Sequence, residues 1–396
     1  MNNKKRLKIG IFMDSFYPAI DGVVLVIDNL AKELSKFNDV TVVVPYTNTM
    51  KTDKKREYDV VRIRSIKVPS TEYRVGEFKL SSSKVYKKLL DKKFDIIHIH
   101  SPFTVGYLGL RIAKELNIPC VATMHTRFDY EIRKLLNNQL FVDYVINNIA
   151  HIYNKCDATI AINHAMIKVF KDFGYKYKPT VIYNGTDLKP LQNKEENISK
   201  LKEKYNIKKD ESIFLFVGRI TEIKNIFFIL DSLKILKEKN FKFKMFYVGT
   251  GPDEEKLKNK ISKYNMENEV IMTGRIEDRV ELSSMYAMSD LFLFPSLFDA
   301  SSLVQIEAAV NETPGLFIEG SVTSDTVINN VSGFTSKEDV NEYANKIIEI
   351  MNNKSLLKEV SKNAKKMLGK SWTDIAIETH NFYIKQIEKK KKSISK

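Results

Sequence analysis

The sequence predicts an α/β protein built from two doubly wound domains, each with a parallel sheet covered by helices on both faces. Short apolar, β-branched runs alternate with segments whose apolar residues recur at i, i+3 and i+4. This alternation restarts after a turn-rich stretch at residues 183–190. The length of 396 residues is also too great for one ordinary hydrophobic core.

The elements of the first half follow from β-branched runs bounded by polar or turn residues. The expected strands are Lys8–Met13, Val40–Pro45, Val60–Ile63, Ile96–Ile99, Cys120–Thr123, Ala158–Ala161 and Thr180–Tyr183. The first expected helix is Val23–Phe37, whose apolar residues share one face. Strands separated by helices of this kind pair in parallel.

A second series opens after a polar helix expected at Ser199–Tyr205. Its strands are Ser212–Val217, Lys244–Val248, Val270–Met272, Leu291–Phe294 and Gly315–Ile318, with a helix at Ile226–Lys237. We therefore expect domains of residues 1–188 and 189–371. A final helical segment, Ser371–Ile387, either caps the second domain or crosses back, in which case residues 372–396 join the first.

Composition narrows the class of protein. Two cysteines, Cys120 and Cys156, form neither a disulfide framework nor a metal spacing, which fits a reducing compartment. The apolar run near the N-terminus is interrupted by Asp14, so we interpret it as a strand rather than a signal peptide. No stretch approaches the roughly 20 apolar residues of a membrane-spanning helix.

The positive charge lies almost wholly in the first half. Residues 1–185 carry a net charge of +12 and residues 186–396 carry +3. A basic half attracts phosphates of lipid headgroups or nucleic acid. Basic and apolar residues are mixed in two segments, Lys84–Lys93 and Arg127–Asn154, as they are in helices at a membrane surface. A helix that faces the core on one side and solvent on the other has the same pattern. No nucleic-acid-reading motif accompanies these segments, so we expect no nucleic-acid partner.

The strongest candidate binding loop is Gly218-Arg219-Ile220-Thr221-Glu222-Ile223-Lys224-Asn225. It follows a strand and precedes a helix, at the strand end where open α/β sheets bind ligands. Arg219 and Lys224 are two cations that would neutralise a diphosphate. An exposed loop with two ordinary basic residues is the alternative.

A second loop, residues 295–309, also follows a strand. Ser301 and Ser302 are N-cap candidates, and a helix starting there would offer free amides to a phosphate. Glu307 lies among apolar residues inside that helix, so its carboxylate needs a partner, either ribose hydroxyls or a salt-bridge cation.

Further candidates lie in the first half. Gly22 follows the first strand and allows close backbone approach to a ligand. His125 ends a strand and is a candidate substrate contact, whereas His98 and His100 share a strand face without the carboxylate or cysteine partners of a metal site. We expect no metal. Residues 249–254 fail the dinucleotide fingerprint, and no phosphate-binding P-loop motif occurs.

Taken together, these motifs resemble the retaining glycosyltransferases of family 4, which have two Rossmann-like domains (GT-B type) facing across a cleft. The matching segments run in order along nearly the whole chain: Asp21–Val23, Asp95–Pro102, Thr123–His125, Val181–Asp187, Gly218–Asn225, Gly249–Pro252, Ser289–Ser296 and Asp299–Glu307.

The resemblance implies a role for each site residue. Arg219 and Lys224 would bind the donor diphosphate, and Glu307 would bind the ribose. Asp299 stands where the family has a glutamate that holds the donor sugar, so the sugar contact is shifted.

The remaining implied contacts are with the donor. Ser302, Leu303 and Val304 begin the donor-binding helix, Gly22 belongs to the glycine loop, and His125 orients the sugar. The resemblance further implies front-face attack with retention and no protein nucleophile.

Within the family, residues 301–309, 313–314 and 320–324 are most similar to the bacterial diacylglycerol glucosyltransferases (monoglucosyldiacylglycerol synthases). This implies a UDP-sugar donor, a lipid acceptor, an anionic membrane surface as partner, and a peripheral place on the cytoplasmic face of the cell membrane. The first domain would bind the acceptor and face the membrane, and the second would bind the nucleotide sugar. A polysaccharide or soluble glycan acceptor, or an inactive nucleotide-sugar-binding relative, are the alternatives.

Overall fold

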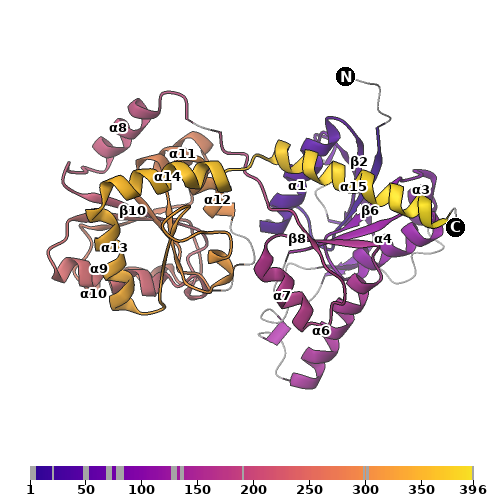
Figure 1. The fold of residues 1–396 in the computed structure, drawn as a ribbon, viewed down its shortest axis with the longest axis horizontal. Helices are drawn as coiled ribbons and strands as arrows, with labels where there is room; N and C mark the ends of the chain where they lie inside the picture. The colour runs from indigo at the N-terminus through magenta and orange to yellow at the C-terminus, as the bar shows by residue number, and fades with distance from the viewer. Residues whose placement is uncertain are drawn as a thin grey trace. The chain divides into compact units, whose positions relative to one another are not determined.

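The structure is a computed structural model that describes residues 6–19, 22–47, 53–67, 74–76, 84–125, 132–133, 138–189, 191–297, 299 and 303–394. The chain divides into two compact units. The first comprises Met1–Gly185 and Ser371–Lys396, and the second comprises Thr186–Lys370. Figure 1 shows the elements of both units.

The first unit is a parallel sheet with helices on both faces. Its elements are β1 (Lys8–Phe12), α1 (Gly22–Ser35), β2 (Asp39–Pro45), β3 (Asp59–Ile63), β4 (Ser65–Lys67), β5 (Arg74–Gly76), α3 (Lys84–Asp91), β6 (Ile96–Ile99), α4 (Thr104–Glu115), β7 (Cys120–Met124), α6 (Gln139–Asn154), β8 (Ala158–Ala161), α7 (His164–Asp172), β9 (Thr180–Val181) and α15 (Trp372–Ile394). The described strands of the main sheet lie in the order β3-β2-β1-β6-β7-β8-β9, and β4 and β5 form a separate antiparallel pair.

The strand order reverses direction between β1 and β6. The chain runs outward from β1 to β3, then returns to β6 on the other side of β1 and continues outward to β9. The loops after β1 and β6 therefore leave the sheet in opposite directions and open a crevice at its carboxyl edge. Residues that follow Phe12 and Ile99 lie at this point.

The second unit repeats this plan. Its elements are α8 (Lys194–Lys204), β10 (Ser212–Val217), η2 (Glu222–Lys224), α9 (Ile226–Glu238), β11 (Phe243–Val248), α10 (Glu254–Lys263), β12 (Val270–Gly274), α11 (Arg279–Met288), β13 (Leu291–Leu293), α12 (Leu303–Val310), β14 (Gly315–Ile318), η3 (Val322–Ser324), β15 (Phe334–Ser336), α13 (Val340–Asn352) and α14 (Lys354–Leu368). The parallel sheet has the order β12-β11-β10-β13-β14-β15, so the order reverses between β10 and β13. The prediction of two doubly wound α/β domains is confirmed.

The central strand of the second unit is apolar throughout because helices cover both of its faces. Phe214, Leu215 and Phe216 of β10 are fully buried within one continuous core. Burying a side chain of this size contributes about 1.5–3 kcal/mol. The core therefore fixes the point at which β10 ends, and with it the start of the loop at Gly218.

The last helix belongs to the first unit. α15, yellow in Figure 1, packs along α1. The Thr373 hydroxyl donates to Glu33 at 2.7 Å, and Lys390 pairs with Asp157 at 2.8 Å. Of the two alternatives for this segment, the structure shows the return to the first unit.

Some boundaries differ from those expected. α8 begins at Lys194 rather than Ser199, and α15 continues to Ile394 rather than ending at Ile387. Glu195 and Glu196 lie in the first turn of α8, where carboxylates interact favourably with the helix dipole. The short strands β4, β5 and β15 were not expected, because three residues carry too little periodicity to be recognised.

Candidate functional site

The loop after β10 carries the two expected phosphate-binding cations. Gly218 turns the chain at φ +157°, and Arg219 follows with an exposed side chain. Lys224 closes the short η2 turn, and α9 begins after Asn225, which adopts left-handed φ and ψ angles. The loop thus presents both basic residues at the carboxyl edge of the sheet, beside the reversal of strand order.

Glycines in the neighbouring loop hold this segment in place. A Cβ on Gly249 would lie 1.9 Å from the Gly218 carbonyl oxygen, and one on Gly251 would lie 2.1 Å from the Ile220 carbonyl oxygen. The Ile220 amide also donates to the Thr250 carbonyl at 3.0 Å. The two loops therefore touch backbone to backbone, which requires glycine.

Asp299 faces the cationic loop. Its carboxylate forms an ion pair with Lys224 and is mostly buried. Next to this pair, the Asn225 side-chain amide donates to the Pro295 carbonyl at 3.1 Å, so the loops after β10 and β13 are linked. The Oδ2 atom of Asp299 is buried without a hydrogen-bond partner among the described residues, which leaves an acceptor for a donor such as a sugar hydroxyl.

Glu307 is buried inside α12 and has two partners from α11. Arg279 Nη2 lies 3.3 Å from Oε1, and the Tyr286 hydroxyl donates to Oε2 at 3.0 Å. Arg279 also pairs with Asp187. Burial raises the pKa of Glu307, while Arg279 and Tyr286 oppose that rise. A carboxylate has about four acceptor positions, so room remains for ribose hydroxyls.

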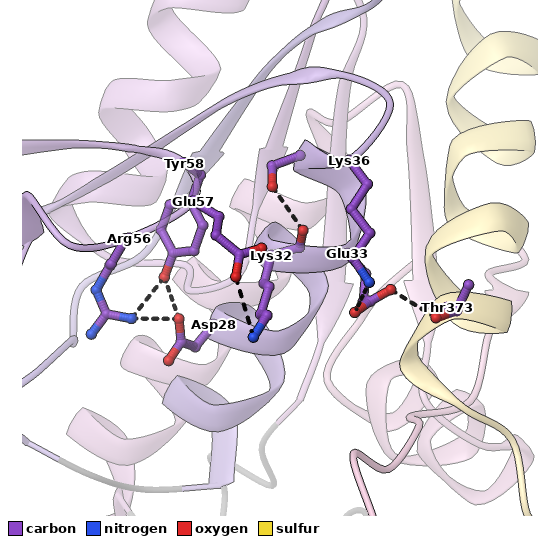
Figure 2. Close-up of polar contacts among 9 residues, drawn as sticks. Asp28, Lys32, Glu33, Lys36, Arg56, Glu57, Tyr58 and Thr373 are labelled. Atoms are coloured by element: carbon purple, nitrogen blue, oxygen red, sulfur yellow. Dashed lines mark hydrogen bonds and ion pairs between the residues drawn. The ribbon is translucent and has the colours of Figure 1, made fainter. Parts of the chain in front are cut away.

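In the first unit, Gly22 is the exposed first residue of α1, and nothing lies within 4 Å of the position of its absent Cβ. Tyr17, in the loop after β1, belongs to a polar cluster around Asp28 of α1. Figure 2 shows Asp28 bound by Arg56, at 2.5 Å, and by the Tyr58 hydroxyl. The Tyr17 hydroxyl donates to the other oxygen of Asp28 at 2.8 Å, and Arg56 stacks on the Tyr17 ring at 4.3 Å.

His125 follows β7 and is buried with two other histidines. His100 Nδ1 and His125 Nε2 are 2.8 Å apart, and the His98 ring lies 3.9 Å from the His100 ring. Burial lowers the pKa of His125 to about 3, so its imidazole is neutral at neutral pH. A neutral imidazole both donates and accepts one hydrogen bond, which suits contact with a hydroxyl.

Comparison with known proteins adds to this geometry. The model described as Glycosyltransferase Family 4 matches residues 20–190, and the model described as Glycosyl transferases group 1 matches residues 197–367. These two models cover the carboxyl-edge loops of both units. The chain is a family 4 glycosyltransferase.

Relatives of this glycosyltransferase include two α-monoglucosyldiacylglycerol synthases. The one from Acholeplasma laidlawii is 28% identical over 98% of this chain and 100% of the relative. The one from Streptococcus pneumoniae is 29% identical over 78% of this chain and 70% of the relative. A capsular polysaccharide biosynthesis glycosyltransferase of Staphylococcus aureus, CapM, is 27% identical over 48% of this chain and 52% of the relative.

Solved structures share the fold. Anabaena HepE in complex with UDP has a TM-score of 0.77 at 18% identity and covers 95% of this chain and 99% of that one. Sucrose-phosphate synthase from Thermosynechococcus elongatus has a TM-score of 0.72 at 19% identity and covers 96% of this chain and 99% of that one.

The structure places most of the expected site residues at the two carboxyl edges. In the second unit, Lys224 and Asp299 are in direct contact, Arg219 lies in the same loop as Lys224, and Leu303 and Val304 are the half-buried first residues of α12. In the first unit, Gly22 and His125 follow β1 and β7. Ser302, together with Ser301, lies outside the described residues.

Several residues of the site were missed from the sequence. The partners of Glu307, Arg279 and Tyr286, lie on another helix, and no local pattern connects them. The contact of His100 with His125 follows from β6 and β7 being neighbours in the sheet. The glycines at 249 and 251 were noted as a failed dinucleotide motif and as part of a family-matching segment, but their close contact with the neighbouring loop was not foreseen.

The part of the chain that the structure describes has no helix both long and apolar enough to cross a membrane. It also contains no group of three or more histidine, cysteine, aspartate or glutamate side chains arranged to hold a metal ion.

Proposed function

We propose that this glycosyltransferase transfers glucose from UDP-glucose to a diacylglycerol-type membrane lipid, with retention of configuration. The observation that carries the proposal is the similarity to an α-monoglucosyldiacylglycerol synthase over 98% of this chain and the whole length of the relative. An α-linked product formed from an α-linked UDP-sugar corresponds to retention. The complex of the structurally similar HepE with UDP and glucose supports a uridine nucleotide as carrier.

The charges of the second unit suit departure of a nucleotide diphosphate. Negative charge develops on the β-phosphate as the sugar bond breaks, and Arg219 and Lys224 would stabilise it. The backbone of the loop that carries them is held against the Gly249 loop, so it needs little reorganisation during the reaction. These cations would serve without an obligatory metal ion.

The ion pair with Asp299 neutralises the charge of Lys224 before a diphosphate binds. When a diphosphate binds, it competes with Asp299 for Lys224, and the Asp299 carboxylate becomes available to the donor sugar. Asp299 is one methylene shorter than the family's glutamate, so we propose that its contact with the sugar hydroxyls reaches less far. Glu307, held by Arg279 and Tyr286, would bind the ribose.

In this proposal the acceptor binds the first unit on the cytoplasmic face of the membrane, where the enzyme lies as a peripheral protein. The net charge of +12 over residues 1–185 favours an anionic surface. On α3, Tyr86 and Leu89 are buried while Lys84, Lys87 and Lys88 are exposed. On α6, Leu140 and Tyr144 are exposed at 81% and 63%, one helical turn apart. Together they offer basic and apolar contacts to lipid.

The alternative acceptor is a cell-envelope polysaccharide or a soluble glycan. The similarity to the capsular glycosyltransferase CapM favours it over the part of the chain that this relative covers. An acceptor of this kind requires no attraction to lipid, so the two candidates differ in their dependence on an anionic surface.

The test is incubation of the purified protein with UDP-glucose or UDP-galactose and diacylglycerol in anionic lipid micelles, followed by product identification. We expect an α-glucosyl lipid, formed faster as the anionic lipid fraction rises, and formed equally in the presence of a chelator. Transfer only to a glycan acceptor, or transfer that ignores anionic lipid, would contradict the lipid proposal. A β-linked product would contradict retention.

Variants connect the product to the site. Arg219→Ala and Lys224→Ala should each lower turnover by roughly 100-fold or more, since each removes a cation at the developing charge. Lys258→Ala is the matched control, because this exposed lysine on α10 pairs with Glu255 alone among the described residues. Equal turnover in all three variants would refute the phosphate-binding roles.

A further inference from the structure

Three histidines of the first unit form a continuous buried array that ends at His125. His98, His100 and His125 are 1%, 3% and 7% exposed. The ring centroids of His100 and His125 are 5.1 Å apart and their planes differ by 17°, so the rings meet edge to edge through their nitrogens. The array brings together the carboxyl ends of β6 and β7, next to the reversal of strand order.

One proton lies between His100 and His125. Both rings are neutral, because burial lowers the pKa of His100 well below its ordinary value and that of His125 to about 3. The 2.8 Å contact between His100 Nδ1 and His125 Nε2 therefore has a single hydrogen, carried by one ring or the other. The choice decides which nitrogen of His125 carries its own proton.

The remaining nitrogen of His100 decides this choice. Nε2 of His100 is buried and has no hydrogen-bond partner among the described residues. A proton placed there would be a buried N–H without an acceptor, which is destabilising and is rarer in proteins than an unpaired acceptor. The proton of His100 therefore belongs on Nδ1, from which it is donated to His125 Nε2.

We propose that His100 is a positioning residue that fixes His125 in the tautomer with its proton on Nδ1. His125 then accepts from His100 with Nε2 and offers an N–H donor from Nδ1. In this state it donates to an oxygen of the sugar and does not act as a general base through Nδ1. That role for His125 rests on the proposed function, whereas the tautomer does not.

The C-terminal helix anchors the other end of the array. The Tyr383 hydroxyl of α15 lies 2.6 Å from His98 Nδ1, and Thr123 Oγ1 lies 2.7 Å from His98 Nε2. Both ring nitrogens of His98 are thus engaged, so its ring cannot turn without breaking a buried hydrogen bond. His100 packs against this fixed ring at 3.9 Å. Tyr383, although distant in sequence, therefore supports the orientation of His100.

The first test measures which ring nitrogen of His125 carries the proton. Imidazole ¹⁵N NMR spectra of the full-length protein, assigned with single histidine variants, should show His125 protonated on Nδ1 and His100 also protonated on Nδ1 at pH 7. Protonation of His125 on Nε2 would overturn the proposal. This measurement needs no substrate, so it stands even if the lipid glucosyltransferase proposal fails.

The second test uses substitutions with UDP-glucose as the donor. His100→Asn keeps an N–H near the position of Nδ1 and should retain most of the turnover. His100→Leu removes the donor and should lower kcat between about 10- and 100-fold, with little change in the KM for UDP-glucose. Equal kcat values for the two variants, with both proteins folded, would contradict a positioning role.

Tyr383→Phe has a matched control in Tyr153→Phe. Tyr153 is also fully buried in the first unit, but its hydroxyl has no partner among the described residues. We expect Tyr383→Phe to lower kcat about fivefold, the equivalent of one ordinary hydrogen bond, and to leave part of the His125 population in the other tautomer. Tyr153→Phe should leave both unchanged. Identical behaviour of the two variants would remove Tyr383 from the proposal.

Discussion

Lowering the pH from 7 to 5 should destabilise the first unit through its buried histidines. Burial lowers the pKa values of His98 and His125 from 6.5 to about 3, and desolvation is the largest cause for both. In the unfolded chain these imidazoles take up protons near pH 6.5, whereas in the folded chain they stay neutral. The unfolded state therefore binds more protons between pH 6.5 and 3, and stability falls as the pH falls through this range.

The size of the effect follows from the two pKa values. A pH of 5 is about 1.5 units below the pKa of each imidazole in the unfolded chain and still above its pKa in the folded chain. Each histidine therefore removes about 2 kcal/mol of the free energy of unfolding at that pH. The pair removes about 4 kcal/mol, a large part of the 5–15 kcal/mol of a typical domain. His100 acts in the same direction. Asp14 acts in the opposite direction, because burial raises its pKa.

The assay can follow the first unit alone. Trp372 is the only tryptophan of the chain, and it is buried at the start of α15, within the first unit. Urea titrations followed by its fluorescence at pH 7, 6 and 5 give the free energy of unfolding at each pH. His125→Asn should reduce the slope of that free energy against pH by about 1.4 kcal/mol per unit near pH 5, the value for one proton.

A control separates the histidines from the other titrating groups. His164 lies on α7 with an exposed side chain, so His164→Asn is the comparison, and the slope should fall more in His125→Asn than in His164→Asn. Wild-type stability that is equal at pH 7 and pH 5, or an unchanged slope in His125→Asn, would refute the argument that this histidine is buried and neutral.

Three further changes test other parts of the fold. Tyr286→Phe leaves one oxygen of the buried Glu307 with a partner fewer, so UDP affinity measured by calorimetry should fall while the second unit loses about 1–2 kcal/mol. Gly249→Ala places a Cβ against the backbone of the neighbouring loop, and UDP affinity should fall at least about tenfold, the 1.4 kcal/mol that even a modest displacement costs. Arg56→Ala leaves the carboxylate of Asp28 without its cation, and tryptophan fluorescence in urea should show a loss of about 3 kcal/mol in the first unit.

Most of the fold was predictable because buried parallel strands have a strong local signal. Ile96–Ile99 and Ser212–Val217 are apolar runs between polar residues, and their observed bounds equal the expected ones. Helix ends were less accurate, as α8 shows, because its polar sequence has no apolar stripe to mark where it begins. The position of α15 could not be decided, because its packing on α1 depends on contacts between segments far apart in the chain.

The residues of the candidate site also divide into those that a local sequence pattern predicts and those that it does not. Arg219 and Lys224 were identified because they follow a strand directly, and strand ends are where such sheets bind ligands. The partners of Glu307 were not identified, because Arg279 and Tyr286 reach it from a different helix. The sequence left open whether Glu307 has a salt bridge within the chain, and the structure shows one.

The carboxyl edges of the two units differ in their electrostatics, and each suits one part of the proposed reaction. Arg219 and Lys224 remain charged, as suits stabilisation of the negative charge that a departing diphosphate gains. His125 is held neutral by burial. A sugar that loses its leaving group gains positive charge at the anomeric carbon, and an imidazolium beside it would raise the barrier through repulsion. A neutral imidazole would orient the sugar without that penalty, and among the described residues His125 contacts His100 and no carboxylate that would raise its pKa.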